Sequence, residues 1–266
     1  MKIVNRQPQT TADVSSARGT AGKEFRQLVL AALVVLVAVY FIVGLTVDLV
    51  VSRISFETET RIFKHVQVPV PTEQDASRSK SLQRAEEILA KLRKNPTVPP
   101  LPYRLVLIED EKPNAFALPG GTIGVTTGLL AVLDEEVEVA FVLGHELGHF
   151  YHRDHLEGMG RAIGFQIILA LFSSGSGAES FGNVVEFALQ RGYSRKREKM
   201  ADRFGLELVH ATYGNVKGVE RLFQILLDER TLPGWAYMFL THPSPGERIA
   251  DLESFAATLG RQQLEP

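Results

Sequence analysis

The chain of 266 residues contains no cysteine. Disulfide bonds, thiolate metal ligands and a cysteine nucleophile are therefore excluded, although a cysteine-free domain can fold on either side of a membrane. A strong charge of one sign is also missing, because 29 Lys and Arg residues face 31 Asp and Glu residues. With no long basic run, the sequence gives no reason to expect nucleic acid as a partner. No internal repeat is evident, and the length suits one medium-sized domain with appendages.

Charge and proline are both absent from one long apolar stretch, Leu28 to Val47. Its 20 residues would span roughly 30 Å as a helix, which matches the hydrocarbon core of a bilayer. A cleavable signal peptide is the main alternative, but the run is long for a signal core and no clear A-x-A site follows it. We therefore predict an uncleaved single-pass membrane anchor over residues 28–50, after a tail of residues 1–27.

Basic residues beside this anchor give a small bias to its orientation. Lys23 and Arg26 precede it closely, whereas Arg53 is the lone basic residue just after it. The positive-inside rule then places the tail in the cytoplasm and the large domain outside, which in a bacterial inner membrane means the periplasm. An organelle transit segment is an alternative for the Arg- and Ser-containing tail, and its two acidic residues count against that alternative.

Residues 51–76 are expected to form an extended lead-in followed by a linker. Apolar residues alternate there in places, and Pro69 and Pro71 introduce a polar run. Apolar residues then recur at helical spacing over residues 82–92, among charged residues that would face water. This pattern predicts an amphipathic helix at the start of the main domain.

The next part of the chain has the pattern of a small β-sheet followed by helices. Short, largely apolar runs, with a Pro-Gly-Gly turn before the last of them, predict strands over residues 105–108, 114–118 and 122–126. A short helix is expected over residues 128–133. The fold class predicted is α+β, with a mainly helical domain over residues 77–260 and a short tail over residues 261–266.

The strongest chemical signal is the H-E-x-x-H motif of His145, Glu146 and His149. Acidic residues at positions 134–136 are typical of the first turn of a helix, so the motif is expected within a helix. Histidines four residues apart then lie on one helix face and can hold two corners of a zinc tetrahedron. Glu146, beside them, can act as a general base toward the attacking water.

Two glycines interrupt this predicted helix, at positions 144 and 148. Each weakens a helix by roughly 1 kcal/mol relative to alanine. We therefore expect them to serve packing, by letting a neighbouring backbone come close.

Two residues compete as third metal ligand. His155 lies ten residues after His145, as in the metzincin pattern H-E-x-x-H-x-x-G-x-x-H. That pattern needs a glycine where this chain has His152, so both His152 and His155 are expected to be surface residues at the helix end. Glu198 is the other candidate, because a carboxylate from a second helix would complete a His₂Glu site, with Asp202 placed to fix a ligand imidazole. The four cationic residues around Glu198 are equally typical of an exposed helix, so the residues by themselves leave the choice open.

Four sequence blocks, in order over about residues 103–250, resemble the membrane-linked gluzincins typified by the CAAX prenyl protease and HtpX. The blocks are N-A-F-A-L-P-G-G (114–121), HELGH (145–149), S-R-x-x-E-x-x-A-D (194–202) and T-H-P-S-P-G-E-R-I (241–249). The resemblance implies a zincin domain in which one zinc ion per chain is bound by two histidines and a glutamate. Its ligands would be His145, His149 and Glu198. Glu146 would be the base, and Asp202 would accept a hydrogen bond from a ligand imidazole.

The resemblance also implies a substrate edge. Along the cleft it places an edge strand that flanks the H-E-x-x-H helix and consists of Asn114, Ala115, Phe116 and Ala117. An extended peptide can pair with such an edge through backbone hydrogen bonds, which recognises a main chain without demanding a sequence. Protein or peptide substrates are therefore expected to bind as an extended strand.

Further site residues are expected from the same resemblance. His242 should lie near the metal, where it would act in catalysis by steadying the oxyanion or would cover the open metal position at rest. Tyr193 and Arg248 are weaker candidates for oxyanion stabilisation. A Gly- and Ser-rich stretch over residues 173–182 suits either a flap over the cleft or an ordinary loop.

The chain departs from the best-known gluzincins of this type in having one predicted membrane span. Residues 164–172 are apolar but too short to cross a bilayer, so they are expected to pack as a core helix against the motif helix. We predict a membrane-anchored zinc endopeptidase that acts on misfolded or membrane-associated proteins, closest to the single-domain extracytoplasmic members. The alternative is a non-catalytic or latent zinc-binding scaffold of the same fold in membrane protein quality control.

Overall fold

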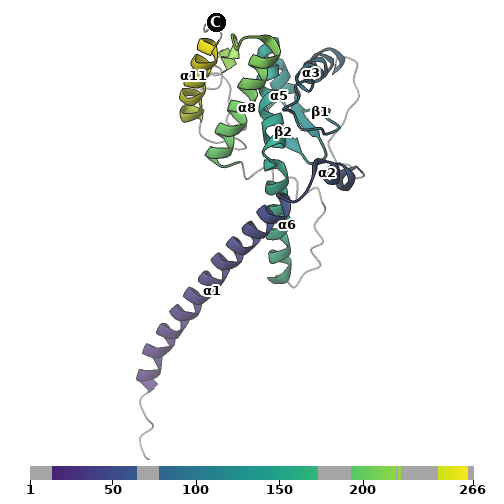
Figure 1. Cartoon of the computed structure of the whole chain (residues 1–266). Coiled ribbons are helices and arrows are strands. Elements are labelled where there is room, and N and C mark those ends of the chain that lie inside the picture. Colours follow the sequence, from purple (N-terminus) through teal and green to yellow (C-terminus); the bar gives the residue numbers. More distant parts are fainter. Residues whose placement is uncertain (1–13, 65–77, 173–192, 220, 223–244, 263–266) are drawn as a thin grey trace, which may run out of the picture. The chain divides into compact units, whose positions relative to one another are not determined.

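The computed structural model describes residues 14–64, 78–172, 193–219, 221–222 and 245–262 (Figure 1). The chain divides into two units, Met1–Thr46 and Val47–Pro266. The helices are α1 (Val14–Val51), α2 (Phe56–Phe63), α3 (Arg78–Leu92), α4 (Thr127–Val132), α5 (Glu136–Tyr151), α6 (Asp154–Phe172), α8 (Arg195–Tyr213) and α11 (Pro245–Gln262). The strands are β1 (Arg104–Ile108), β2 (Ala115–Leu118) and β3 (Thr122–Thr126). This arrangement confirms the predicted α+β class.

The first unit contains most of helix α1. Large apolar side chains are exposed around this helix, including Phe41 at 67% and Leu45 at 72% of their surface. The segment Gly22–Val51 is long and apolar enough to cross a membrane. A helix that is apolar all round in this way is typical of a membrane span, so the helical part of the anchor prediction is confirmed.

Helix α2 replaces the extended lead-in that the sequence predicted, and that prediction was wrong for residues 56–63. Ser55 caps the helix, since its hydroxyl oxygen accepts a hydrogen bond of 3.1 Å from the backbone N–H of Thr58. The residue that faces the interior is Glu59, which is completely buried. A charged residue at the inward position hides the helical period of apolar residues. The rest of the predicted linker, residues 65–77, lies outside the described residues.

The three predicted strands form one mixed sheet in the order β1-β3-β2. β1 runs parallel to β3, and β2 runs antiparallel to β3. Gly120 and Gly121, in the turn between β2 and β3, have φ angles of +82° and +83°, which glycine adopts without strain. Because the strand order is β1-β3-β2, β2 lies at an edge of the sheet within the described part of the chain, and it contacts α5.

Helices α5 and α8 lie side by side (Figure 1). Their backbones approach more closely than large side chains would allow. A Cβ atom built on Gly148 would lie 2.8 Å from the Cα of Ala201, and one on Gly144 would lie 3.0 Å from the Cα of Gly205. This confirms the expectation that the two motif glycines admit a neighbouring backbone. The contact also brings the carboxylates of α8 against the histidines of α5.

One hydrophobic cluster holds these elements together. It joins side chains of α3, the sheet, α5, α8 and α11. α5 begins at Glu136, which agrees with the helix start that acidic residues 134–136 predicted, and a capping box of Glu135 and Glu138 holds its first turn. The stretch 164–172 belongs to helix α6, which contacts α5 and β2, but its side chains beyond residue 165 lie outside the description.

Candidate active site

Three buried side chains form a group that can hold a metal ion: His145, His149 and Glu198. The Nε2 atoms of the two histidines are 3.1 Å apart. Glu198 places one carboxylate oxygen 3.7 Å from Nε2 of His145 and the other 3.6 Å from Nε2 of His149. Ligand atoms about 2.0–2.1 Å from a tetrahedral ion are separated by about 3.3 Å, so this spacing fits three corners of such a site.

Carboxylates hold the outer nitrogen of each imidazole. Nδ1 of His145 lies 2.8 Å from Oδ1 of Asp202, and Nδ1 of His149 lies 2.8 Å from Oδ2 of Asp154. An ionised carboxylate only accepts hydrogen bonds, so each neutral imidazole carries its proton on Nδ1. The two Nε2 lone pairs then face each other across 3.1 Å. A cation between them would relieve that repulsion, so the donor set fits a metal.

Arg248, from α11, lies behind the same group. Its Nε and one terminal nitrogen donate to the two carboxylate oxygens of Asp202 at 2.7 and 2.6 Å, and its other terminal nitrogen lies 3.0 Å from Glu198. Burial by itself would raise the pKa of Asp202. The charge and hydrogen bonds of Arg248, with a smaller contribution from His145, outweigh burial and hold that pKa far below its usual range.

Comparison with known proteins agrees with this geometry. Residues 76–256 match the model of peptidase family M48. The chain belongs to peptidase family M48. Membership confirms the resemblance seen in the sequence and places the chain in a family of metallopeptidases.

Relatives come from bacteria and mitochondria. The beta-barrel assembly-enhancing protease of Yersinia pestis is 27% identical over 168 residues, which cover 58% of this chain and 35% of that protein. The mitochondrial metalloendopeptidase OMA1 of Schizosaccharomyces pombe is 32% identical over 158 residues, covering 58% of this chain and 47% of OMA1. An HtpX protease homologue of Acidiphilium cryptum is 31% identical over 197 residues, or 58% of this chain and 68% of that protein. The chain thus spans less than half the length of the first two.

Two further groups of this M48 site lie close to the candidate ligands. Glu146 is buried in the same helix as the histidines, with 1% of its surface exposed. The ring of Tyr193 stacks on the imidazole of His149, with centroids 4.0 Å apart. Burial raises the pKa of the Tyr193 hydroxyl well above 10, and the charges of Glu146, Asp154 and Glu198 raise it further. The hydroxyl therefore stays protonated at neutral pH and can donate a hydrogen bond.

Asp154 was not identified from the sequence. It follows a turn at Arg153, a non-glycine residue with a φ of 65°, which redirects the chain after α5 and returns a carboxylate to His149. Burial raises the pKa of Asp154 to about 6, even though the charge of Arg197 lowers it. An acidic residue just beyond the end of the motif helix was the available signal, but only the turn shows where it points.

Both histidines of the rejected metzincin pattern differ from the surface residues that we expected. His155 is 4% exposed, and its Nε2 lies 2.8 Å from the carboxylate of Glu59, so it is a buried residue outside the metal group. His152 is half-buried at the C-cap of α5. Burial lowers its pKa, which favours the neutral ring over the partly positive one that we expected at a helix end.

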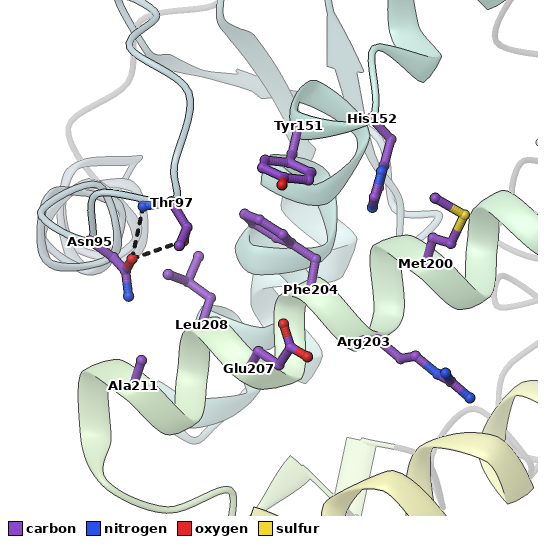
Figure 2. Close-up of a pocket in the computed structure, with 10 residues that line it drawn as sticks. All are labelled: Asn95, Thr97, Tyr151, His152, Met200, Arg203, Phe204, Glu207, Leu208 and Ala211. Atoms are coloured by element: carbon purple, nitrogen blue, oxygen red, sulfur yellow. Dashed lines mark hydrogen bonds between the residues drawn. The ribbon is translucent and has the colours of Figure 1, made fainter.

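A surface pocket of about 330 Å³ lies away from this chemistry (Figure 2). On α8 its lining includes Met200, Phe204 and Glu207. With 3.6 residues per turn, these residues project from the opposite side of α8 to Glu198 and Asp202. Figure 2 shows that side chains from the end of α5 also line the pocket. Because its α8 residues face away from Glu198 and Asp202, the pocket is distinct from the metal site.

The remaining predicted site residues divide into described and undescribed ones. Asn114 and Ala115 are buried at the start of the edge strand, and the ring of half-buried Phe116 covers Gly124 on β3. Binding of substrate at this edge stays a prediction. His242 and the stretch 173–182 lie outside the described residues, so their predicted roles stay predictions as well.

Proposed function

We propose that this M48 peptidase is a membrane-anchored zinc endopeptidase. The convergence of two imidazole Nε2 atoms and one glutamate carboxylate, with each Nδ1 taken by an aspartate, carries the proposal. Nitrogen and oxygen donors at tetrahedral spacing are typical of catalytic zinc, which keeps a fourth position for substrate or water. Glu146, buried beside this group, supplies the base that hydrolysis requires.

The side chains divide the chemical work. A zinc ion held by His145, His149 and Glu198 would supply Lewis-acid polarisation of the scissile carbonyl. Glu146 takes a proton from the attacking water and passes it to the leaving amine. Tyr193, protonated at neutral pH, is suited to donate a hydrogen bond to the oxyanion, as is His242 by resemblance.

Arg248 suits a different role from the oxyanion stabiliser expected from resemblance. Its guanidinium contacts both carboxylates of the site, Asp202 and Glu198. We therefore assign it to holding these carboxylates ionised and in place.

Substrates would bind as extended segments of protein chain along the edge of β2, at Asn114 to Ala117. Backbone pairing accepts many sequences, which suits misfolded or membrane-associated proteins as substrates. The apolar helix of residues 22–51 supports a membrane location for the enzyme. The small basic bias around that helix supports a catalytic domain on the periplasmic side of a bacterial inner membrane.

Glu146→Gln tests the function. The full chain, purified in detergent, is expected to bind one zinc ion and to cleave unfolded casein, and chelation followed by zinc addition should remove and restore cleavage. The variant should keep its zinc and lose cleavage, because glutamine cannot accept the proton. An active variant would refute the proposed mechanism. Zinc binding without any turnover by the natural chain would instead favour the non-catalytic scaffold.

A further inference from the structure

Glu59 is a completely buried carboxylate far from the metal ligands in sequence. Its Oε1 accepts a hydrogen bond of 2.9 Å from the backbone N–H of Gly120 and lies 2.8 Å from Nε2 of His155. Its Oε2 accepts a hydrogen bond of 2.7 Å from Arg153. One side chain of α2 therefore contacts two other segments of the domain.

Both segments belong to the catalytic frame. Gly120 lies in the turn that leads from β2, the proposed substrate edge, into β3. Arg153 and His155 follow the end of α5, and Nδ1 of His155 lies 3.2 Å from the carbonyl oxygen of the ligand His149. The carboxylate of Glu59 thus joins the substrate edge to the metal-binding end of α5.

The local backbone fits closely around this junction. A Cβ atom on Gly120 would lie 2.9 Å from the Cβ of Phe63, so α2 is seated directly on the turn (Figure 1). Arg153 also donates to the carbonyl oxygen of Ile54 and lies over the ring of Phe56, 4.3 Å from its centroid. The chain on both sides of Glu59 is therefore held by the same frame.

Stability alone is a weak reason for such a cluster. Taking charges out of water costs several kcal/mol per ion, and apolar residues of similar size often stabilise a protein as well or better. A buried carboxylate that accepts hydrogen bonds from several segments, in contrast, fixes the relative positions of the segments that it joins.

We propose that Glu59 is a positioning residue of the peptidase, which sets the β2 edge relative to the metal site so that a peptide paired with β2 presents its scissile bond there. The proposal rests on the proposed function. α2 begins five residues after α1 ends, so the segment that leaves the candidate anchor forms part of the frame of the active site.

Glu59→Gln and Glu59→Ala test this role in the full chain, with Glu57→Gln as the matched control. Glu57 is on the same helix, but its side chain is 83% exposed and pairs with Arg61. For long peptides that reach β2, the Glu59 variants should lose on the order of tenfold in kcat/KM, mainly through KM. Short peptides should be affected much less, and the control should behave as the natural chain. Equal losses for short and long peptides would overturn the proposal, because a merely structural role lowers only the amount of active enzyme.

Hydrogen exchange gives a readout that does not depend on activity. Both Glu59 variants should keep their zinc while the amide of Gly120 and those of β3 exchange faster than in the Glu57 control. Unchanged exchange would overturn the proposal even if the enzyme is active, whereas an inactive natural chain would refute the proposed function instead. If the Glu59 variants do not fold, Arg153→Lys keeps the positive charge but loses the fork that joins Glu59 to Ile54. The same dependence on peptide length is expected there, and its absence would count against the proposal.

Discussion

At the scale of single residues, the two imidazoles of the candidate metal site are held in different ways. Asp202, which lies against Nδ1 of His145, is paired with the guanidinium of Arg248. That pairing holds the pKa of Asp202 far below the usual range. Asp154, which lies against Nδ1 of His149, is also buried, but the nearby charge of Arg197 does not offset the effect of burial. Burial therefore raises the pKa of Asp154 to about 6. The His145 half of the site therefore depends on a cation from α11, which the H-E-x-x-H motif does not contain.

Arg248→Ala is expected to weaken metal binding. The substitution leaves Asp202 and Glu198 as like charges in the interior without their cation, and loss of such outer partners typically lowers metal affinity about 10–100-fold. Chelator competition measures this affinity, and thermal unfolding of the metal-free chain measures the cost to stability. Removing one partner of a buried ion pair costs about 3–5 kcal/mol.

Arg203→Ala is the matched control for that substitution. Arg203 joins the same two helices through Asp251, but half of its side chain is exposed to solvent. Its loss should cost about 1 kcal/mol or less and leave the metal site unchanged. A fall in kcat with unchanged metal affinity in Arg248→Ala would contradict the holding role and restore the oxyanion role expected from resemblance.

At the scale of elements, the site depends on how closely α5 approaches α8. Gly148→Ala should push the helices apart, because the added Cβ would meet the Cα of Ala201 at 2.8 Å and a backbone cannot rotate away. The gain in helix propensity is only about 1 kcal/mol, so we expect a net loss of stability together with weaker metal binding. Unfolding by denaturant and chelator competition measure the two effects.

Gly158→Ala, on α6, is the corresponding control. Its Cβ would make an ordinary contact of 3.9 Å with the ring of Tyr193. That variant should keep the metal and match or exceed the natural stability. Normal metal affinity in Gly148→Ala would show that helix spacing does not position the ligands.

At the scale of the whole molecule, we expect the first unit to serve membrane attachment and the second unit to carry out catalysis without it. A chain that starts at Val47 lacks the first unit but keeps α2 and the whole second unit. It should be soluble without detergent and should still bind zinc and cleave peptides. A chain that starts at residue 65 also lacks α2 with Glu59 and should cleave long peptides much less efficiently. Detergent-free fractionation and peptide assays measure both, and a chain from Val47 that stays with membranes would contradict the anchor assignment.

Local patterns in the sequence determined much of this protein. The apolar run, the three strands and the motif helix all follow from residue spacing within a few turns, and the structure contains each of them. Histidines four residues apart share a helix face because of helix geometry alone. The same local rules failed at α2, where the inward residue is the charged Glu59 rather than an apolar one.

Tertiary structure decided the rest of the site. Glu198 and His155 had both remained open as third ligand from spacing, but the approach of α8 brings Glu198 to the histidines while Glu59 holds His155 elsewhere. These contacts join residues about fifty to one hundred positions apart, and long-range pairing leaves no periodic mark in a single sequence. The sequence therefore sufficed for the H-E-x-x-H motif, and its resemblance to known proteases pointed to Glu198, whereas Asp154 and the contacts of Arg248 with the site carboxylates required the fold.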